Sequence, residues 1–222
     1  PDLNPQELAS VTYAGGSKLN SITRNGAGQV TGQQWTFPSA DTITDTAARS
    51  QAGRGMQEKI TRGTDSYPST YQYDAAGRLT SAAIPGHTLT YGFAATGGCG
   101  VNAAAGASGN RTSLTDVWTA PGGSAVTTST SYCYDWADRL TSTSVTGAIP
   151  GANSVAAGVA ASNIVYDAQG NVVRLADMLF SYDAAGLHSG TTYDDGSTVS
   201  VVRDASGRVV SRRIPHHTHG GP

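Results

Sequence analysis

The chain has 222 residues, among them 28 glycines and 10 tyrosines but only 3 phenylalanines and 3 tryptophans. Charged residues make up 14% of it and the net charge is −2, so no basic surface favours DNA or RNA binding. No stretch approaches the roughly 20 apolar residues that a membrane-spanning helix needs. Apolar content is 38%, much of it alanine, which argues against a large aliphatic core.

The N-terminal part of the chain predicts a lead-in to a repeated motif. Pro1 to Pro5 lack the basic start and apolar run of a secretory signal. We expect residues 1–19 to form a lead-in strand region of a piece excised or processed from a longer protein. Two weak copies of a turn motif follow, Asn25–Val30 and Ser50–Arg54.

The clearest copy of the motif is Tyr71-Gln72-Tyr73-Asp74-Ala75-Ala76-Gly77-Arg78-Leu79. Asp-x-x-Gly fits a type I turn, because the aspartate accepts a hydrogen bond from the turn's own amide. The glycine supplies the left-handed conformation that lets the chain enter the partner strand through a bulge. Tyr71 and Tyr73 share one face of the strand before the turn. Leu79 lies on the returning strand, and Arg78 is expected on its opposite face. Each copy therefore predicts one β-hairpin.

A glycine- and alanine-rich insertion, residues 94–110, follows this copy and contains a third weak copy at Gly106–Arg111. It lacks the lysine and the following Ser/Thr-bearing helix that a phosphate-binding loop needs. A second flexible insertion is expected at 147–162, where Pro150-Gly151 is a turn signal. Both insertions are interpreted as loops between hairpins.

Four more copies of the motif follow the first insertion: Tyr132–Leu140, Ile164–Val172, Phe180–Gly186 and Val201–Val209. Arginine replaces the tyrosine in the last copy. Asp138 stands where glycine belongs in the first of the four, and aspartate accepts the left-handed conformation better than most residues. The residues that define the predicted repeat are Tyr71, Tyr73, Asp74, Gly77, Tyr134, Asp135, Tyr166, Asp167, Gly170, Tyr182, Asp183, Gly186, Asp204 and Gly207.

Residues 214–222 are expected to form a flexible, histidine-rich tail. His216, His217 and His219 are weak candidates for a transition-metal site, and a frayed end or a tag remnant is the alternative. We expect no cofactor and no catalytic residue. The recurring aspartates each close their own turn, whereas paired-carboxylate catalysis needs two acids across one cleft.

On these motifs the chain resembles the Rhs/YD-repeat family, which includes secreted bacterial toxin shells, toxin-complex cocoons and animal teneurins. Residues 71–80 match the family's core motif at every defining position, and the copies cover residues 20–213. The resemblance implies an all-β fold, an antiparallel array of consecutive hairpins in a curled or spiral sheet. The family's self-cleaving Asp-Pro-x-Gly signature has no match here, so neither encapsulation nor autoproteolysis is carried over.

The two cysteines allow one disulfide. Cys99 and Cys133 form an even pair in a chain that resembles exported proteins, which favours a bridge between them. The alternative is a catalytic thiol at Cys99 with His87 as its base, a pair that would need to lie within hydrogen-bond reach. Only the residue types support that alternative.

The function expected from the repeat is structural. We expect a non-enzymatic scaffold segment of an exported bacterial protein, extracellular or on the cell surface, which assembles through strand edges into a shell, fibre or filament. Its partners would be further copies of itself or flanking repeats of the same protein. One alternative is an adhesion module that binds carbohydrates or a cell surface through exposed tyrosines. Another is part of a toxin-delivery shell with proteolytic processing.

Overall fold

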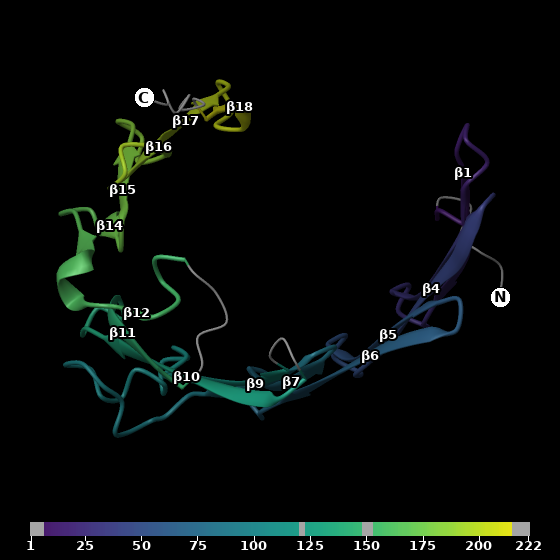
Figure 1. Cartoon of the computed structure of the whole chain (residues 1–222), viewed down its shortest axis with the longest axis horizontal. Coiled ribbons are helices and arrows are strands. Elements are labelled where there is room, and N and C mark those ends of the chain that lie inside the picture. Colours follow the sequence, from purple (N-terminus) through teal and green to yellow (C-terminus); the bar gives the residue numbers. More distant parts are fainter. Residues whose placement is uncertain (1–6, 120–122, 148–152, 215–222) are drawn as a thin grey trace. The chain divides into compact units, whose positions relative to one another are not determined.

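The computed structural model describes residues 7–119, 123–147 and 153–214. The described chain is built from antiparallel strands joined as consecutive hairpins (Figure 1), which confirms the predicted all-β hairpin array. One short 3-10 helix, η1 (Ala161–Asn163), interrupts the strands. Among the described residues, no helix is long and apolar enough to cross a membrane.

The chain divides into two compact units, residues 1–91 with 115–126, and residues 92–114 with 127–222. The strands of the first unit are β1 (Val11–Thr12), β2 (Lys18–Arg24), β3 (Val30–Phe37), β4 (Ala40–Arg49), β5 (Gly55–Arg62), β6 (Asp65–Tyr73), β7 (Leu79–Ile84) and β8 (His87–Gly92). Three strands, β8, β9 (Ser113–Thr119) and β10 (Ala125–Tyr134), contain residues of both units, β8 only through Gly92. The second unit continues with β11 (Leu140–Gly147), β12 (Gly158–Val159), β13 (Ile164–Tyr166), β14 (Val172–Leu175), β15 (Met178–Tyr182), β16 (His188–Tyr193), β17 (Thr198–Arg203) and β18 (Val209–Arg213). Strand order equals chain order in both sheets.

Two sets of connections alternate along the chain, one at each end of the hairpins. At one end, five-residue turns join the strand pairs β2–β3, β4–β5, β6–β7, β10–β11, β13–β14, β15–β16 and β17–β18. At the other end lie tight turns such as Gly63-Thr64, across which Arg62 pairs with Asp65. The turns at 13–17 and 193–197 also lie at this end, although they repeat the five-residue pattern of backbone bonds. We call the strand that enters one of the seven turns at the first end the lead strand, and the strand that leaves it the returning strand.

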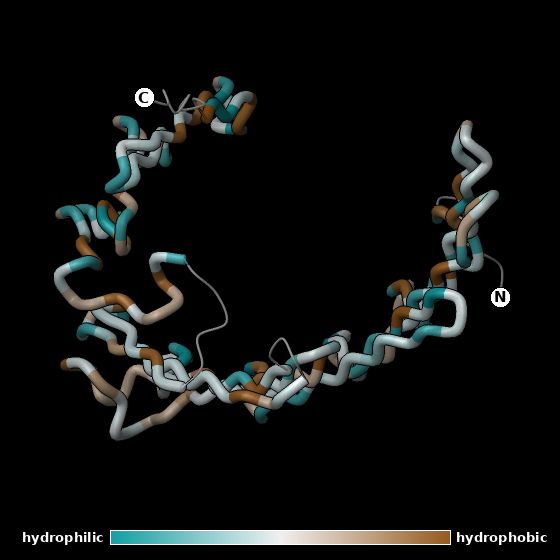
Figure 2. Tube along the Cα trace, in the orientation of Figure 1, coloured by the Kyte–Doolittle hydropathy of each residue, from teal (hydrophilic) through white to brown (hydrophobic). Residues whose placement is uncertain are grey.

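The hydrophobic core is thin. Among the described residues only six apolar side chains are buried: Leu19, Ala82, Ala105, Val159, Ile164 and Ala176. One cluster combines the last three with the half-buried Leu140, Tyr166 and Leu175. Figure 2 shows hydrophobic and hydrophilic residues interspersed along the whole trace, without a long hydrophobic segment. Backbone hydrogen bonds between strands and half-buried aromatic rings therefore carry more of the stability than in an ordinary globular domain.

Three segments differ from the expectation drawn from sequence. The first hairpin already begins at Val11, ahead of the expected start at residue 20. The second insertion, 147–162, contains β12, which pairs with β11 through Thr143 and Val159. The weak copy at Gly106–Arg111 is no hairpin, because consecutive turns occupy it and Gly109 N–H donates to the carbonyl of Gly106. The first residue of this copy is a glycine, which offers no side-chain acceptor to close the turn, and a strand follows it but the described residues directly before it form none.

Candidate functional site

The Asp74 turn shows how the motif closes a hairpin. Asp74 N–H donates to the carbonyl of Arg78 at 3.0 Å, and Gly77 N–H donates to the carbonyl of Asp74 at 2.9 Å. Gly77 has a φ of 83°, the left-handed conformation of a type I turn followed by a bulge. The Asp74 carboxylate accepts from the Arg78 backbone N–H at 2.9 Å and from Arg78 Nε at 2.7 Å. Arg78 is thus held by the turn itself.

The other six turns repeat this backbone pattern. Four of them begin with aspartate and two with another acceptor. Asparagine and serine take the aspartate's place in the two weak copies, where Asn25 Oδ1 accepts from Gln29 N–H and Ser50 Oγ from Arg54 N–H. Asp138 adopts a φ of 58° in the glycine position. The seven first residues are Asn25, Ser50, Asp74, Asp135, Asp167, Asp183 and Asp204.

Hydrogen bonds hold four of the turn aspartates in the charged form. The backbone N–H of the residue that ends the turn, Arg78 or Arg139, is the main reason that the pKa of Asp74 or Asp135 lies below its usual value. For Asp167 the Asn171 amide lowers the pKa most, and for Asp204 the Ser206 hydroxyl does. A carboxylate with a lowered pKa is a poor proton donor at neutral pH, so these groups suit turn closure better than acid catalysis.

At six of the seven turns the residue immediately before the turn donates to a backbone carbonyl in an earlier part of the chain. Tyr73 donates its hydroxyl to the carbonyl of Gly55 at 2.9 Å. Tyr166 donates to Leu140 at 2.9 Å and Tyr182 to Val172 at 2.8 Å. Each accepting carbonyl belongs to the first residue of the preceding returning strand. In Tyr134 the hydroxyl donates instead to Arg111 at the end of the first insertion, at 2.8 Å. Before the first turn, Arg24 donates to the carbonyl of Gly28 in its own turn and pairs with Glu7.

Arginine makes the same link where it replaces the tyrosine. Arg203 Nη2 donates to the carbonyl of His188, the first residue of β16, at 3.2 Å. Arg49 Nε donates to the carbonyl of Val30, the first residue of β3, at 3.4 Å. We call the residues that make this contact the bridging residues; they are Arg49, Tyr73, Tyr134, Tyr166, Tyr182 and Arg203. The sequence motif marked the tyrosines, but the equivalence of the arginines follows only from these contacts.

In two hairpins the last residue of the turn is an arginine that lies against the next bridging tyrosine. The guanidinium of Arg54 lies over the Tyr73 ring at 5.9 Å, and that of Arg139 over the Tyr166 ring at 5.0 Å. Such cation–π contacts are attractive. The residues that end the turns before the two arginine bridges are uncharged, Gln29 before Arg49 and Leu187 before Arg203. In none of these pairs does an arginine meet an arginine, which would bring two positive charges together.

Burial also marks the bridging tyrosines. Loss of contact with water raises the pKa of the Tyr134 and Tyr166 hydroxyls above the usual value. Their hydroxyls are protonated donors at neutral pH, as the bonds to Arg111 and Leu140 require. The bridging position is therefore a fixed structural contact between hairpins.

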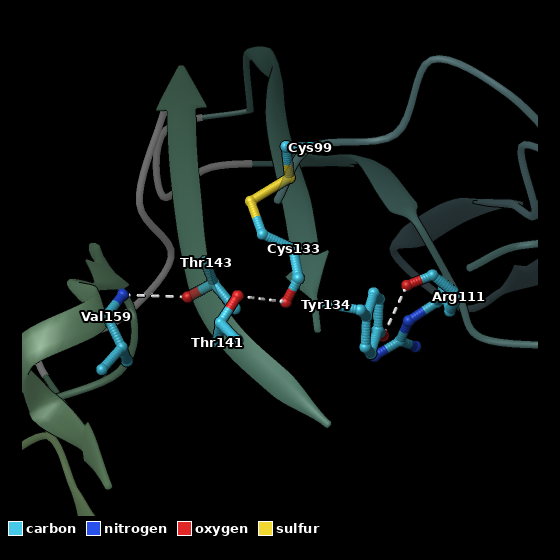
Figure 3. The surroundings of a disulfide bond; sticks show 7 residues. All are labelled: Cys99, Arg111, Cys133, Tyr134, Thr141, Thr143 and Val159. Carbon is cyan, nitrogen blue, oxygen red and sulfur yellow. Dashed lines mark hydrogen bonds between the residues drawn. A yellow bond between two sulfur atoms is a disulfide. The ribbon is translucent and has the colours of Figure 1, made fainter. Parts of the chain in front are cut away.

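A disulfide fastens the first insertion to β10, as the cysteine count favoured. Cys99 and Cys133 are joined with a Cα–Cα distance of 4.7 Å (Figure 3). Buried Asn102 adds two hydrogen bonds, from its N–H to the carbonyl of Tyr134 at 3.1 Å and from its amide to Asp138 at 3.0 Å. Sequence reasoning missed Asn102, because a single asparagine in a glycine-rich stretch gives no signal of its own.

The arrangement gives no support to a catalytic thiol. Cys99 is oxidised in the disulfide and cannot act as a nucleophile. His87 binds a different partner, since its Nδ1 lies 2.9 Å from the carboxylate of Asp116. No group of three or more potential metal ligands occurs among the described residues, and His216, His217 and His219 lie outside them.

Comparison with known proteins bears on the fold. No protein-family model matches the chain, and no curated protein matches it. Crystal structures of TcdB2-TccC3 are similar to it, one with a TM-score of 0.54 at 13% identity over 96% of this chain. The crystal structure of TcdB2-TccC3 without its hypervariable C-terminal region has a TM-score of 0.54 at 12% identity over 95% of this chain. The chain spans 13% of the length of each of these structures. This likeness agrees with a hairpin fold of the Rhs/YD-repeat kind.

Proposed function

We propose that this chain is a non-enzymatic structural scaffold segment of an exported Rhs/YD-repeat protein, which assembles through its strand edges into a larger shell, fibre or filament. The observation that carries the proposal is the chain of bridging contacts. Each links one hairpin to the hairpin before it, for example Tyr166 to Leu140 and Tyr182 to Val172. A contact that repeats from hairpin to hairpin along a sheet suits extension of that sheet.

The thin core supports the same conclusion. With six buried apolar side chains among the described residues, each hairpin depends on its neighbours for cover, as repeat proteins do. The outer strands β1 and β18 each pair on one side only within their sheets. Strand edges of this kind bind further strands unless they are blocked. Extension of the sheet satisfies both needs at once.

The rival functions have weaker support. Sugar stacking requires free aromatic faces. The bridging Tyr73 and Tyr166 are half-buried with a guanidinium over the ring, so that function would fall to exposed rings such as Tyr67 and Trp136. An enzyme would need a nucleophile or a poised acid, and the turn aspartates have lowered pKa values. A place in a toxin-delivery shell rests on the sequence resemblance and on the likeness of nearly the whole chain to a small part of TcdB2-TccC3.

Light scattering after size-exclusion chromatography, over a wide concentration range, tests the proposal together with electron microscopy. We expect species that grow with concentration and an extended or closed assembly in the images. Val210→Lys, on the edge strand β18, should reduce assembly because lysine on an edge opposes strand pairing. Val117→Lys is the matched control, since Val117 is 40% exposed and lies inside the strand order on β9. A chain that stays monomeric throughout the range would overturn edge assembly.

A further inference from the structure

The outer strand β18 (Val209–Arg213) presents an apolar edge. It pairs with β17 on one side and is the last strand of its sheet. All five of its residues are exposed, and Val209, Val210 and the following Ile214 are 48%, 62% and 64% exposed. Adjacent exposed apolar residues on an unpaired strand are a typical feature of a protein-binding surface.

Val209 occupies the accepting position of the bridging contacts. It is the first residue of a returning strand and pairs with its own bridging residue, Arg203, as Leu140 pairs with Tyr134. The carbonyls in this position of Val30, Gly55, Leu140, Val172 and His188 each accept a hydrogen bond from the next bridging residue. No described residue donates in this way to Val209.

We propose that the β18 edge binds the lead strand of a further hairpin whose bridging residue is tyrosine. The tyrosine hydroxyl donates to the carbonyl of Val209, and Val210 and Ile214 cover the strand's apolar side chains. This inference rests on the scaffold function proposed above and names the partner of one of its edges. The partner strand carries tyrosine directly before an Asp-x-x-Gly turn.

The last residue of the Asp204 turn decides between tyrosine and arginine. Arg208 is the equivalent of Arg54 and Arg139, whose guanidiniums lie over the next bridging tyrosine. The Arg208 side chain is 82% exposed and reaches the Asp204 carboxylate only at 3.7 Å. A tyrosine ring placed beneath it gains a cation–π contact, whereas a bridging arginine would meet a like charge.

A peptide with the sequence of residues 178–193, which spans β15, the Asp183 turn and β16, is the probe. Its binding to the intact chain is measured by fluorescence anisotropy, with forms that carry Tyr182→Phe or Tyr182→Arg. We expect the phenylalanine form to bind about five- to tenfold more weakly, since it lacks one hydrogen-bond donor. Amide shifts in nuclear magnetic resonance should concentrate at Val209–Ile214.

The Arg208→Ala variant of the chain distinguishes selection of tyrosine from nonspecific binding of the peptide. It should weaken binding of the tyrosine peptide several-fold and strengthen binding of the arginine peptide, because it removes both the cation–π contact and the like charge. Arg62→Ala is the matched control, because Arg62 is an exposed arginine on β5, a strand of the other sheet. A change of opposite sign for the two peptides is something that a loss of folding would not produce.

Two outcomes would overturn the inference: equal binding of the tyrosine and phenylalanine peptides, or shifts that lie away from β18. If the free peptide does not bind, the same sequence is appended to the C-terminus through a flexible linker, where the effective concentration is in the millimolar range. Equal amide-exchange protection of β18 by the tyrosine and phenylalanine forms then overturns it too. If the chain self-assembles but does not prefer the tyrosine peptide, the scaffold proposal stands and the inference about β18 fails. If the chain stays monomeric but prefers the tyrosine peptide, the inference about β18 stands and edge self-assembly fails.

Discussion

Replacing Tyr166 with phenylalanine would remove one hydroxyl and leave the ring in place. The hydroxyl donates to the carbonyl of Leu140 at 2.9 Å, and the Arg139 guanidinium lies 5.0 Å from the ring centre. Phenylalanine keeps the packing and most of the cation–π contact, so the substitution isolates the hydrogen bond. The link between β11 and the β13 hairpin is the part of the second unit that it should weaken.

The expected loss in unfolding free energy is about 1 kcal/mol, the net contribution of one hydrogen bond between uncharged groups. Leaving a buried acceptor without a donor costs roughly 1 to 3 kcal/mol. The site is half-buried, so water can donate to the Leu140 carbonyl in place of the lost hydroxyl, and the cost should lie near the low end of this range. A loss of this size should lower the melting temperature by about 2–4 °C in a domain of this length.

Thermal and urea unfolding give the global change, and amide exchange measured by mass spectrometry locates it. Exchange should accelerate in β11 and β13 and stay unchanged in β4 and β5. Tyr67→Phe is the matched control, because Tyr67 is 44% exposed and no described residue accepts a bond from its hydroxyl. If Tyr166→Phe proves no more destabilising than Tyr67→Phe, the bridging contact does not link the hairpins and the reasoning fails.

Three further predictions follow from the turns and the disulfide. Stability should fall as pH drops below the ordinary carboxylate pKa of about 4, because folding lowers the pKa of Asp74, Asp135, Asp167 and Asp204. Replacing these four with asparagine should make the urea midpoint depend less on pH in the acid range, and an unchanged dependence would contradict the assignment. Serine at both Cys99 and Cys133, which are 34 positions apart, should lower unfolding free energy by about 4 kcal/mol and speed amide exchange in residues 93–112; equal melting with and without reductant in the wild type would count against it. Gly186→Ala should cost about 1–2 kcal/mol, because φ is 73° there and the added Cβ would meet no other atom, whereas Gly26→Ala, with open space around it and no positive φ, should have little effect; equal melting temperatures for the two variants would refute the turn assignment.

Local signals in the sequence were strong where a turn closes on itself. Asp74 and Gly77 lie three residues apart, and both partners of the turn's hydrogen bonds are within one five-residue segment. Such contacts depend on backbone geometry and short side chains, which the sequence states directly. Gly106–Arg111 shows the limit of the signal, since the same glycine spacing without a side-chain acceptor in first place and without a strand before it gives consecutive turns instead of a hairpin.

Long-range contacts could not be anticipated in the same way. The hydroxyl of Tyr134 reaches back to Arg111, and Asn102 inserts beside the Asp138 turn, 36 positions away. Either contact depends on where a glycine-rich insertion lies against β10, and its composition permits many conformations. The cysteine pair was the exception, because an even count reduces the choice to one partner.

The succession of β-hairpins can be inferred from the turn residues alone, because each turn carries its own acceptor and its own left-handed residue. What the residue before each turn contacts becomes visible only in the folded chain. Tyrosine and arginine look unlike each other in a sequence, yet Tyr182 and Arg203 both donate to the first carbonyl of the preceding returning strand. Their equivalence depends on a neighbouring hairpin, and no pattern within a single motif contains that neighbour.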